Sequence, residues 1–294
     1  MSPNPSIQEI AYLNNATTNV DILRIDEIHA IVSGNKWYKL RFYIEQALIE
    51  KANTLASFGG PYSNHLVALA FAAKENNLKC IGYVRSNEGE PITPTLQDAI
   101  HYGMELKFLG RTQFQEKKEA IITASKLNSF DTTYYIDEGG YGMIGAKGAS
   151  TILNESCSLY DYIVCAVGTG TMIAGIVHAA KENQQVIGIP VLKNEGTIVH
   201  EIKAIMNNPT KAFTLLHQFH EGGYAKTTPR LIEFMNHLWE HSKIPTDIVY
   251  TGKLLFAVYQ LVKAQYFATN SKVLVIHSGG LQGNRSLKQG VLHY

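Results

Sequence analysis

Two lysines near the start of the chain are the first residues whose type and spacing could do chemistry. Lys36 follows a Gly-Asn turn in the segment SGNKWYKL (33–40), and Lys39 lies one helical turn later on the same face. Because like charges repel, such a pair is either a solvated basic face or a place where an anion binds. In the second case the amine of Lys36 loses its proton easily and becomes a nucleophile beside a bound phosphate.

A glycine-rich loop predicts where a phosphate would bind. The segment VGTGTMIAG (167–175) places Gly168, Thr169, Gly170 and Thr171 between an apolar run and a predicted helix. Backbone N–H groups, two hydroxyls and the helix dipole then converge on one anion. No Gly-Lys-Ser/Thr follows, so this is not a Walker A loop, and the third glycine comes too late for a dinucleotide fingerprint. A single phosphate fits best.

Two further glycine loops carry polar side chains. In SFGGPYSNH (57–65), Ser63, Asn64 and His65 begin a predicted helix and offer a hydroxyl, an amide and free backbone N–H groups to a carboxylate. In HSGGLQGN (277–284), Ser278 could bond a ring nitrogen. Each loop taken alone is also compatible with an ordinary turn. Together, the four segments supply the parts that an enzyme dependent on pyridoxal 5'-phosphate (PLP) needs.

The elements that must position these loops follow from the hydrophobic pattern. Short apolar runs alternate with helical patterns, which predicts an α/β fold with mainly parallel sheets and ligands at the carboxyl ends of the strands. The expected strands are Thr54–Phe58, Lys79–Val84, Glu105–Leu109, Thr133–Ile136, Tyr162–Val167, Gln185–Ile189 and Val273–His277. The expected helices are Trp37–Lys51, Asn64–Asn76, Thr95–Tyr102, Phe114–Lys126, Gly145–Ser158, Thr171–Glu182, Pro229–Ser242 and Gly252–Ala268. So many elements indicate two α/β domains or one wide sheet, with Asp137–Gly148 as the crossover.

Composition excludes several classes of function. Lys plus Arg is 26 and Asp plus Glu is 25, and this balance argues against nucleic-acid binding. The 3 cysteines have no CxxC spacing and the histidines no HExxH, so we expect neither disulfides nor a metal site, and a reducing, cytoplasmic location. The amino terminus lacks a signal-peptide pattern. The uncharged stretch Tyr162–Ala180 could span a membrane, but GTGT divides it into strand, loop and helix, so we expect no membrane partner.

In their order along the chain, these motifs resemble the 1-aminocyclopropane-1-carboxylate (ACC) deaminase/D-cysteine desulfhydrase family, among the tryptophan-synthase-β-like (fold type II) PLP enzymes. The resemblance covers nearly the whole chain and rests on GNKxxKL at Gly34–Leu40, GGxxSNH at Gly59–His65, the phosphate loop, YTGK at Tyr250–Lys253 and HxGG at His277–Gly280. It implies two domains with mainly parallel, twisted sheets flanked by helices. Residues 1–41 and 146–294 would form the larger PLP-binding domain, 42–145 the smaller one, with PLP between them, in a homodimer.

The resemblance also implies a role for each candidate residue. Lys36 would hold PLP, and Lys39 would contact its phosphate together with Gly168, Thr169, Gly170 and Thr171. Ser63, Asn64 and His65 would contact the substrate carboxylate, with Asn64 also touching the cofactor ring. Tyr250 matches the family's active-site tyrosine, and Tyr224, in EGGYAK, matches a second one more loosely.

Two positions separate the branches of the family. Deaminases carry Glu directly after the active-site tyrosine and Leu in the late HxGG segment, whereas desulfhydrases carry small hydroxyl residues; this chain has Thr251 and Ser278. A neutral partner of the pyridine nitrogen supports less carbanion character than Glu, which suffices for loss of thiolate. The resemblance therefore favours a D-cysteine desulfhydrase-like α,β-elimination giving pyruvate, ammonia and sulfide. Lys36, or Tyr250 with a lowered pKa, would remove the α-proton.

Departures from the family pattern keep other functions open. Trp37 and Tyr38 replace the common Thr-Arg, and Pro61 and Tyr62 replace a small apolar residue and Gln, close to the expected pocket. The alternatives are ACC deamination, another PLP reaction on a small amino acid, and PLP binding without turnover. A nicotinamide-dependent dehydrogenase is disfavoured by the late third glycine.

Overall fold

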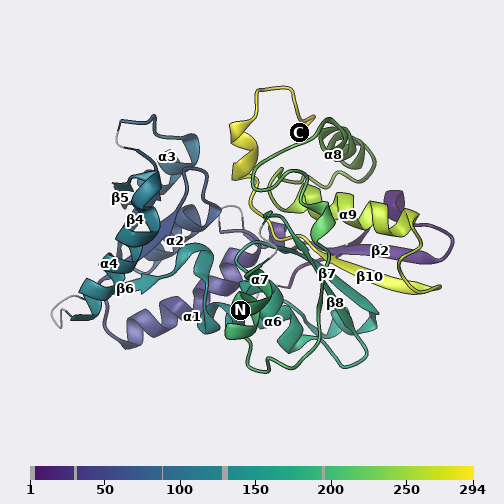
Figure 1. The fold of residues 1–294 in the computed structure, drawn as a ribbon, viewed down its shortest axis with the longest axis horizontal. Coiled ribbons are helices and arrows are strands. Elements are labelled where there is room, and N and C mark those ends of the chain that lie inside the picture. Colours follow the sequence, from purple (N-terminus) through teal and green to yellow (C-terminus); the bar gives the residue numbers. More distant parts are fainter. Residues whose placement is uncertain (1–3, 30–31, 88, 128–131, 194–195) are drawn as a thin grey trace.

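The chain folds into two lobes, each built on its own sheet (Figure 1). The structure is a computed structural model that describes residues 4–29, 32–87, 89–127, 132–193 and 196–294. In Figure 1 one lobe is coloured from purple-blue to teal, and the other joins a purple N-terminal strand to teal-green, green and yellow segments from the second half of the chain.

The larger sheet has the strand order β1-β2-β10-β7-β8-β9. Only its edge strand β1 is antiparallel to its neighbour; the other pairs are parallel. The bounds are β1 Ile7–Glu9, β2 Thr18–Leu23, β7 Tyr162–Val167, β8 Gln185–Pro190, β9 Thr214–Leu215 and β10 Ser271–Ile276. The strand β7, with the sequence YIVCAV, is buried along its whole length, as a β-branched run between two helical layers should be.

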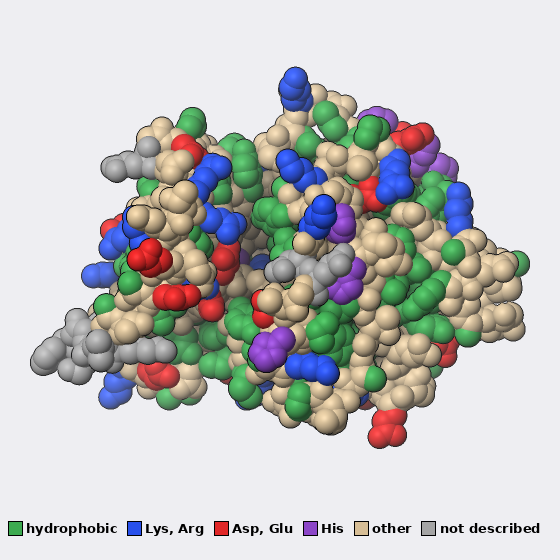
Figure 2. Space-filling model, in the orientation of Figure 1, with side chains coloured by type: hydrophobic (Ala, Val, Ile, Leu, Met, Phe, Trp, Pro, Cys, Tyr) green, Lys and Arg blue, Asp and Glu red, His purple; other side chains and the backbone are tan. Residues whose placement is uncertain are grey.

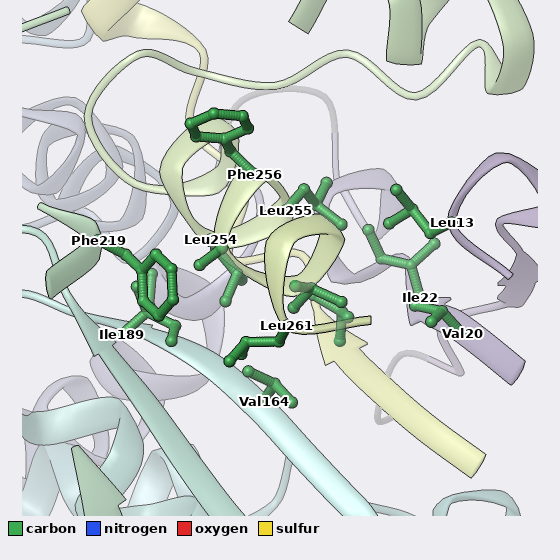
Figure 3. Close-up of a cluster of buried hydrophobic side chains, with 14 of the residues drawn as sticks. Leu13, Val20, Ile22, Val164, Ile189, Phe219, Leu254, Leu255, Phe256 and Leu261 are labelled. Carbon is green, nitrogen blue, oxygen red and sulfur yellow. The ribbon is translucent and has the colours of Figure 1, made fainter. Parts of the chain in front are cut away.

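Helices cover both faces of this sheet, and alternate residues of β7 show which helices lie on which side. Val164 belongs to the apolar cluster of α8 (Pro229–Ser242) and α9 (Thr251–Lys263). Ile163 and Cys165 belong to the cluster of α5 (Met143–Ser150), α6 (Thr171–Ala179) and α7 (Ile198–Ala204). Figure 3 shows the first of these clusters around α9.

The smaller sheet is wholly parallel, with the strand order β5-β4-β3-β6. Its elements are β3 Thr54–Gly59, α2 Asn64–Glu75, β4 Lys79–Arg85, α3 Pro94–His101, β5 Met104–Leu109, α4 Phe114–Leu127 and β6 Thr133–Ile136. The helix α1 (Asn35–Ile49) packs against α2 of this lobe and against α5 of the other. The short 3₁₀ turns are η1 Ala11–Leu13, η2 Ile25–Glu27, η3 Arg111–Gln113, η4 Glu138–Gly140, η5 Glu155–Leu159, η6 His217–Phe219 and η7 Gln282–Ser286.

The strands expected from sequence are all present, within a residue or two at their ends. The uncharged stretch 162–180 is β7, a glycine loop and α6, as predicted, and within the described ranges no helix is long and apolar enough to cross a bilayer. The expected helix Gly145–Ser158 is wrong in its second half: α5 ends at Ser150, and Asn154 then caps the separate turn η5. The elements β1, β2, β9 and α7 were not predicted.

Candidate active site

The two lysines lie at the start of α1 and meet at one carbonyl oxygen. Nζ of Lys36 donates to the backbone oxygen of Gly139 over 3.1 Å, and Nζ of Lys39 to the same oxygen over 3.5 Å. Gly139 belongs to η4, which follows the last strand of the smaller sheet in sequence. The two lysines therefore share one face of α1, as the spacing predicts. That face is turned toward η4, the segment that leads from the smaller lobe to the larger one.

The electrostatics of this pair favour a bound anion. Lys39 is only 3% exposed, and neither lysine forms an ion pair with any residue that the structure describes. Burial lowers the pKa of Lys36 to about 8, partly opposed by the Glu138 carboxylate. Burial and the neighbouring Lys36 hold the pKa of Lys39 well below its ordinary value. A phosphate bound beside Lys39 would favour the charged form of that amine, while Lys36 stays available as a neutral nucleophile.

The glycine loop predicted to bind phosphate lies next to these lysines. Thr171 begins α6, Gly170 precedes it with a φ of 82°, and the hydroxyls of Thr169 and Thr171 are 3.0 Å apart. A Cβ added to Gly139 would lie 3.1 Å from Thr169 Cγ2 and 3.8 Å from Lys36 Nζ. The loop, the helix N-terminus and Lys36 therefore converge on one small region. This donor set, all hydroxyl, ammonium and backbone N–H, fits the phosphate and aldehyde ends of PLP.

Ser63 and Asn64 lie where the smaller lobe approaches the larger one. The hydroxyl of Ser63 caps α2 by accepting from the N–H of Leu66, which leaves its own proton for a ligand. The side-chain amide of Asn64 donates to the backbone oxygen of Gly280 over 3.2 Å, and its Oδ1 is buried without a hydrogen-bond partner. An unpartnered buried amide oxygen at this position suits a donor from a bound cofactor or substrate.

His65 is placed differently from its two neighbours. Its side chain is 2% exposed, and its Nε2 lies 2.8 Å from the hydroxyl of Ser57, which itself donates to the backbone oxygen of Ile136. Because Ser57 has one proton and uses it there, Nε2 must be the protonated nitrogen of His65. Nδ1 is then a lone-pair acceptor, buried and without a partner. The imidazole is thus tied to the smaller sheet, and the group that His65 can offer a carboxylate is its backbone N–H.

Tyr250 and Thr251 begin α9, and Asp247 fixes both. Oδ2 of Asp247 accepts from the backbone N–H groups of Val249 and Tyr250 over 2.8 and 3.0 Å. Oδ1 accepts from the N–H and the hydroxyl of Thr251 over 2.8 and 2.7 Å. The single proton of the Thr251 hydroxyl is therefore used on Asp247, so Thr251 can only accept from a ring nitrogen. Burial raises the pKa of Asp247, and these four donors oppose that rise.

Tyr224 lies in the loop that precedes α8, and its side chain interacts with that of Tyr250 at the start of α9. Burial, and then a hydrogen bond and the charge of Tyr224, raise the pKa of Tyr250 well above its ordinary value. The lowered pKa expected for Tyr250 from the family role is therefore wrong. Burial also raises the pKa of Tyr224, while Arg85 lowers it and Glu138 raises it. Asp247 of the larger lobe also raises the pKa of Tyr224, so charges from both lobes act on this side chain, which is 48% exposed. Figure 2 shows the surface hollowed between the lobes, with charged side chains along it.

Ser278 lies at the carboxyl end of β10, against the start of α1. Its backbone oxygen accepts from the N–H of Asn35 over 3.0 Å, which joins the two segments. The residue is 6% exposed, and its hydroxyl has no hydrogen-bond partner among the residues described. This free hydroxyl is the group predicted to bond a ring nitrogen, a role that stays a prediction.

Sequence reasoning missed three charged residues of the site: Glu138, Asp247 and Lys253. Asp247 had a local signal, since an Asp just before a helical run is a common cap. Glu138 lies inside the glycine-rich crossover 137–148, whose composition indicates a turn and gives no sign of a charged site residue. Lys253 was noted only as part of a motif, and nothing in its sequence neighbourhood indicated its partners.

A pH titration tests the environment of Lys36. In the apo protein, we expect the rate of covalent attachment of pyridoxal phosphate to rise with pH through a midpoint near 8, because only the neutral amine attacks and burial lowers its pKa to about that value. In Glu138→Gln the midpoint should be lower, because that carboxylate raises the pKa of Lys36. Glu182→Gln, at an exposed site, is the control. A midpoint above 10, or an upward shift in Glu138→Gln, would contradict the geometry.

Comparisons with known proteins agree with this arrangement. A family model described as pyridoxal-phosphate dependent enzyme matches residues 13–279. A Bradyrhizobium protein named 1-aminocyclopropane-1-carboxylate deaminase is 25% identical over 85% of this chain and 82% of its own. An Arabidopsis thaliana protein, named bifunctional D-cysteine desulfhydrase/1-aminocyclopropane-1-carboxylate deaminase, mitochondrial, is 24% identical over 90% of this chain and 73% of its own. A solved structure described as an ACC deaminase homologue superposes with a TM-score of 0.83 at 24% identity, covering 96% of this chain and 90% of the other.

Proposed function

The chain belongs to the family of pyridoxal-phosphate dependent enzymes, and from that premise we propose that it eliminates the β-substituent of a small amino acid, with D-cysteine as the preferred substrate. The cofactor is therefore PLP, and the fold is fold type II, both as predicted. The proposed reaction converts D-cysteine and water into pyruvate, ammonia and sulfide.

The residues divide the work of this reaction as follows. PLP, when bound, supplies the electron sink that stabilises negative charge at the α-carbon. Lys36 holds the cofactor and, with a pKa lowered to about 8, accepts the α-proton near neutral pH. Lys39 and the loop 168–171 hold the phosphate. Ser63, Asn64 and the N–H groups at the start of α2 orient the carboxylate.

Tyr250 acts as a hydrogen-bond donor in this scheme. Because its pKa is raised, its hydroxyl stays protonated across the neutral range and can donate a hydrogen bond to the departing sulfur. We therefore assign the base to Lys36 in this proposal.

One observation carries the preference for elimination over ring opening: the hydroxyls at positions 251 and 278 are neutral. Ser278 offers a free hydroxyl, and that of Thr251 is bonded to Asp247. A neutral hydroxyl at either position favours a protonated ring nitrogen less strongly than a facing carboxylate would. ACC deamination is the second candidate, favoured by the name of the Bradyrhizobium relative; the Arabidopsis relative bears both names.

Parallel assays of D-cysteine and ACC separate the two candidates. We expect the PLP-loaded protein to release sulfide and pyruvate from D-cysteine with kcat/KM at least about tenfold above that for ACC, because thiolate is the better leaving group at a weak electron sink. L-cysteine in the same assay controls for stereochemistry. Consumption of ACC with inert D-cysteine would overturn the proposal, and inertness of both would assign the site to another amino acid.

We further propose the domain division given above, with 42–145 as the smaller domain. The strands support it, since those of the smaller sheet lie within 54–136 and those of the larger sheet outside that range. As the family resemblance implies, we also propose a homodimer acting on a small amino acid, and from the cysteine pattern we propose a cytoplasmic location.

A further inference from the structure

Lys253 lies in the first turn of α9, and its side chain has no exposed surface. A buried cation is stable only with partners. Its Nζ donates to the backbone oxygen of His220 over 2.9 Å and to that of Gly223 over 2.5 Å. Among the described residues it forms no ion pair, so its hydrogen bonds go to the backbone of one loop, His220–Lys226.

This loop, His220–Lys226, has a backbone that needs outside support. Glu221, Gly222, Gly223 and Ala225 all have φ between 49° and 108°, in the left-handed region. Non-glycine residues in that region persist only where their surroundings hold them. Lys253 holds the loop from α9.

A second tie starts from the same end of the loop, at Glu221, and reaches across to the start of α8. Glu221 is 5% exposed, and its carboxylate accepts from the hydroxyl of Thr228 over 2.5 Å and from the guanidinium of Arg230 over 2.6 Å. Gly223, whose carbonyl Lys253 holds, directly precedes Tyr224.

The helix α9 is a rigid base for the Lys253 tie. Leu254 and Leu255, the next residues, are fully buried, and Figure 3 shows them in one cluster with Phe219, which directly precedes His220. Asp247 caps the same helix and fixes Tyr250 at its start. A single turn of α9 thus carries Tyr250 at one end and, three residues later, the cation that holds the loop of Tyr224.

We propose that Lys253 is a positioning residue: by holding the carbonyls of His220 and Gly223, it sets the hydroxyl of Tyr224 against that of Tyr250. The catalytic consequence rests on the proposed function, whereas the positioning itself does not. Lys253 therefore matters to the reaction through Tyr224, without contacting substrate or cofactor.

Hydrogen exchange of the PLP-loaded protein tests the positioning without any substrate. In Lys253→Met, we expect the backbone amides of 221–226 to exchange at least about tenfold faster, because the loop loses both hydrogen bonds from the Lys253 amine. Lys253→Gln keeps one amide donor and should lie between Met and wild type. Lys263→Met, at the other end of α9, is the matched control and should leave the loop unchanged. Wild-type protection of the loop in both Lys253 variants would overturn the proposal.

A double-mutant cycle tests the catalytic consequence. We expect Lys253→Met and Tyr224→Phe each to lower kcat for D-cysteine about 10- to 100-fold with a smaller change in KM, and the double variant to be no slower than the slower single one. If the double variant instead showed the product of the two single decreases in kcat, Lys253 would act independently of Tyr224, and the assignment would be overturned. If wild type turns over neither D-cysteine nor ACC, the proposed function fails, and the exchange experiment still decides the role of Lys253.

Discussion

Lys36→Ala is expected to abolish both turnover and the covalent attachment of PLP. Lys39 is not expected to take its place, because its amine is buried one helical turn further along α1 and holds the phosphate in the proposed site. Loss of the residue that both holds the cofactor and accepts the α-proton should lower kcat by about 10³-fold or more. Borohydride reduction followed by mass spectrometry of the peptide containing residue 36 measures the attachment directly, and sulfide release measures turnover.

Lys147→Ala is the control for this experiment. Lys147 lies on α5, which packs against α1, but its side chain is exposed and its amine lies over the ring of Phe42. We expect this variant to keep both cofactor and activity. PLP found on another lysine of Lys36→Ala, or turnover within a few fold of wild type, would show that the site has been assigned to the wrong residue.

How much of this site could be predicted depended on how local its signals are. The loop 168–171 was predicted correctly as the start of a helix, because an apolar strand, two glycines and hydroxyls stand next to each other in sequence. The shared face of Lys36 and Lys39 follows from helical spacing alone. Each of these two predictions depends on a few neighbouring residues, so neither requires knowledge of the rest of the fold.

The features that were missed depend on contacts between distant segments. The orientation of His65 is decided by Ser57 and, through it, by the carbonyl of Ile136, on a different strand of the smaller sheet. The direction of the pKa shift of Tyr250 is decided by its burial and by the neighbouring Tyr224, which is distant in sequence. No sequence pattern near residue 65 or 250 carries that information. For the same reason β9 was missed, since it pairs with β8 through very few residues.

Gly34→Ala is expected to be the most damaging single-methyl change in the protein. Gly34 has φ 66° and ψ −148°, a conformation that is essentially restricted to glycine. A Cβ at this position would lie 1.9 Å from the backbone oxygen of Ser278, so either α1 or the loop after β10 must move. Backbone strain and overpacking together should lower the free energy of unfolding by about 3–5 kcal/mol.

The consequence for the active site follows from what that contact joins. Gly34 directly precedes the helix turn that carries Lys36, and Ser278 carries the hydroxyl proposed for the ring nitrogen, so any shift that relieves the clash separates the two groups. Gly103→Ala separates strain from clash: Gly103 also has a positive φ, 89°, but a Cβ there meets nothing within 4 Å. We expect it to cost about 1–2 kcal/mol and to leave cofactor binding intact. Chemical denaturation and PLP titration of both variants measure these effects. If Gly34→Ala binds PLP as tightly as Gly103→Ala, then the close approach of residue 34 to residue 278 does not set the geometry of the site.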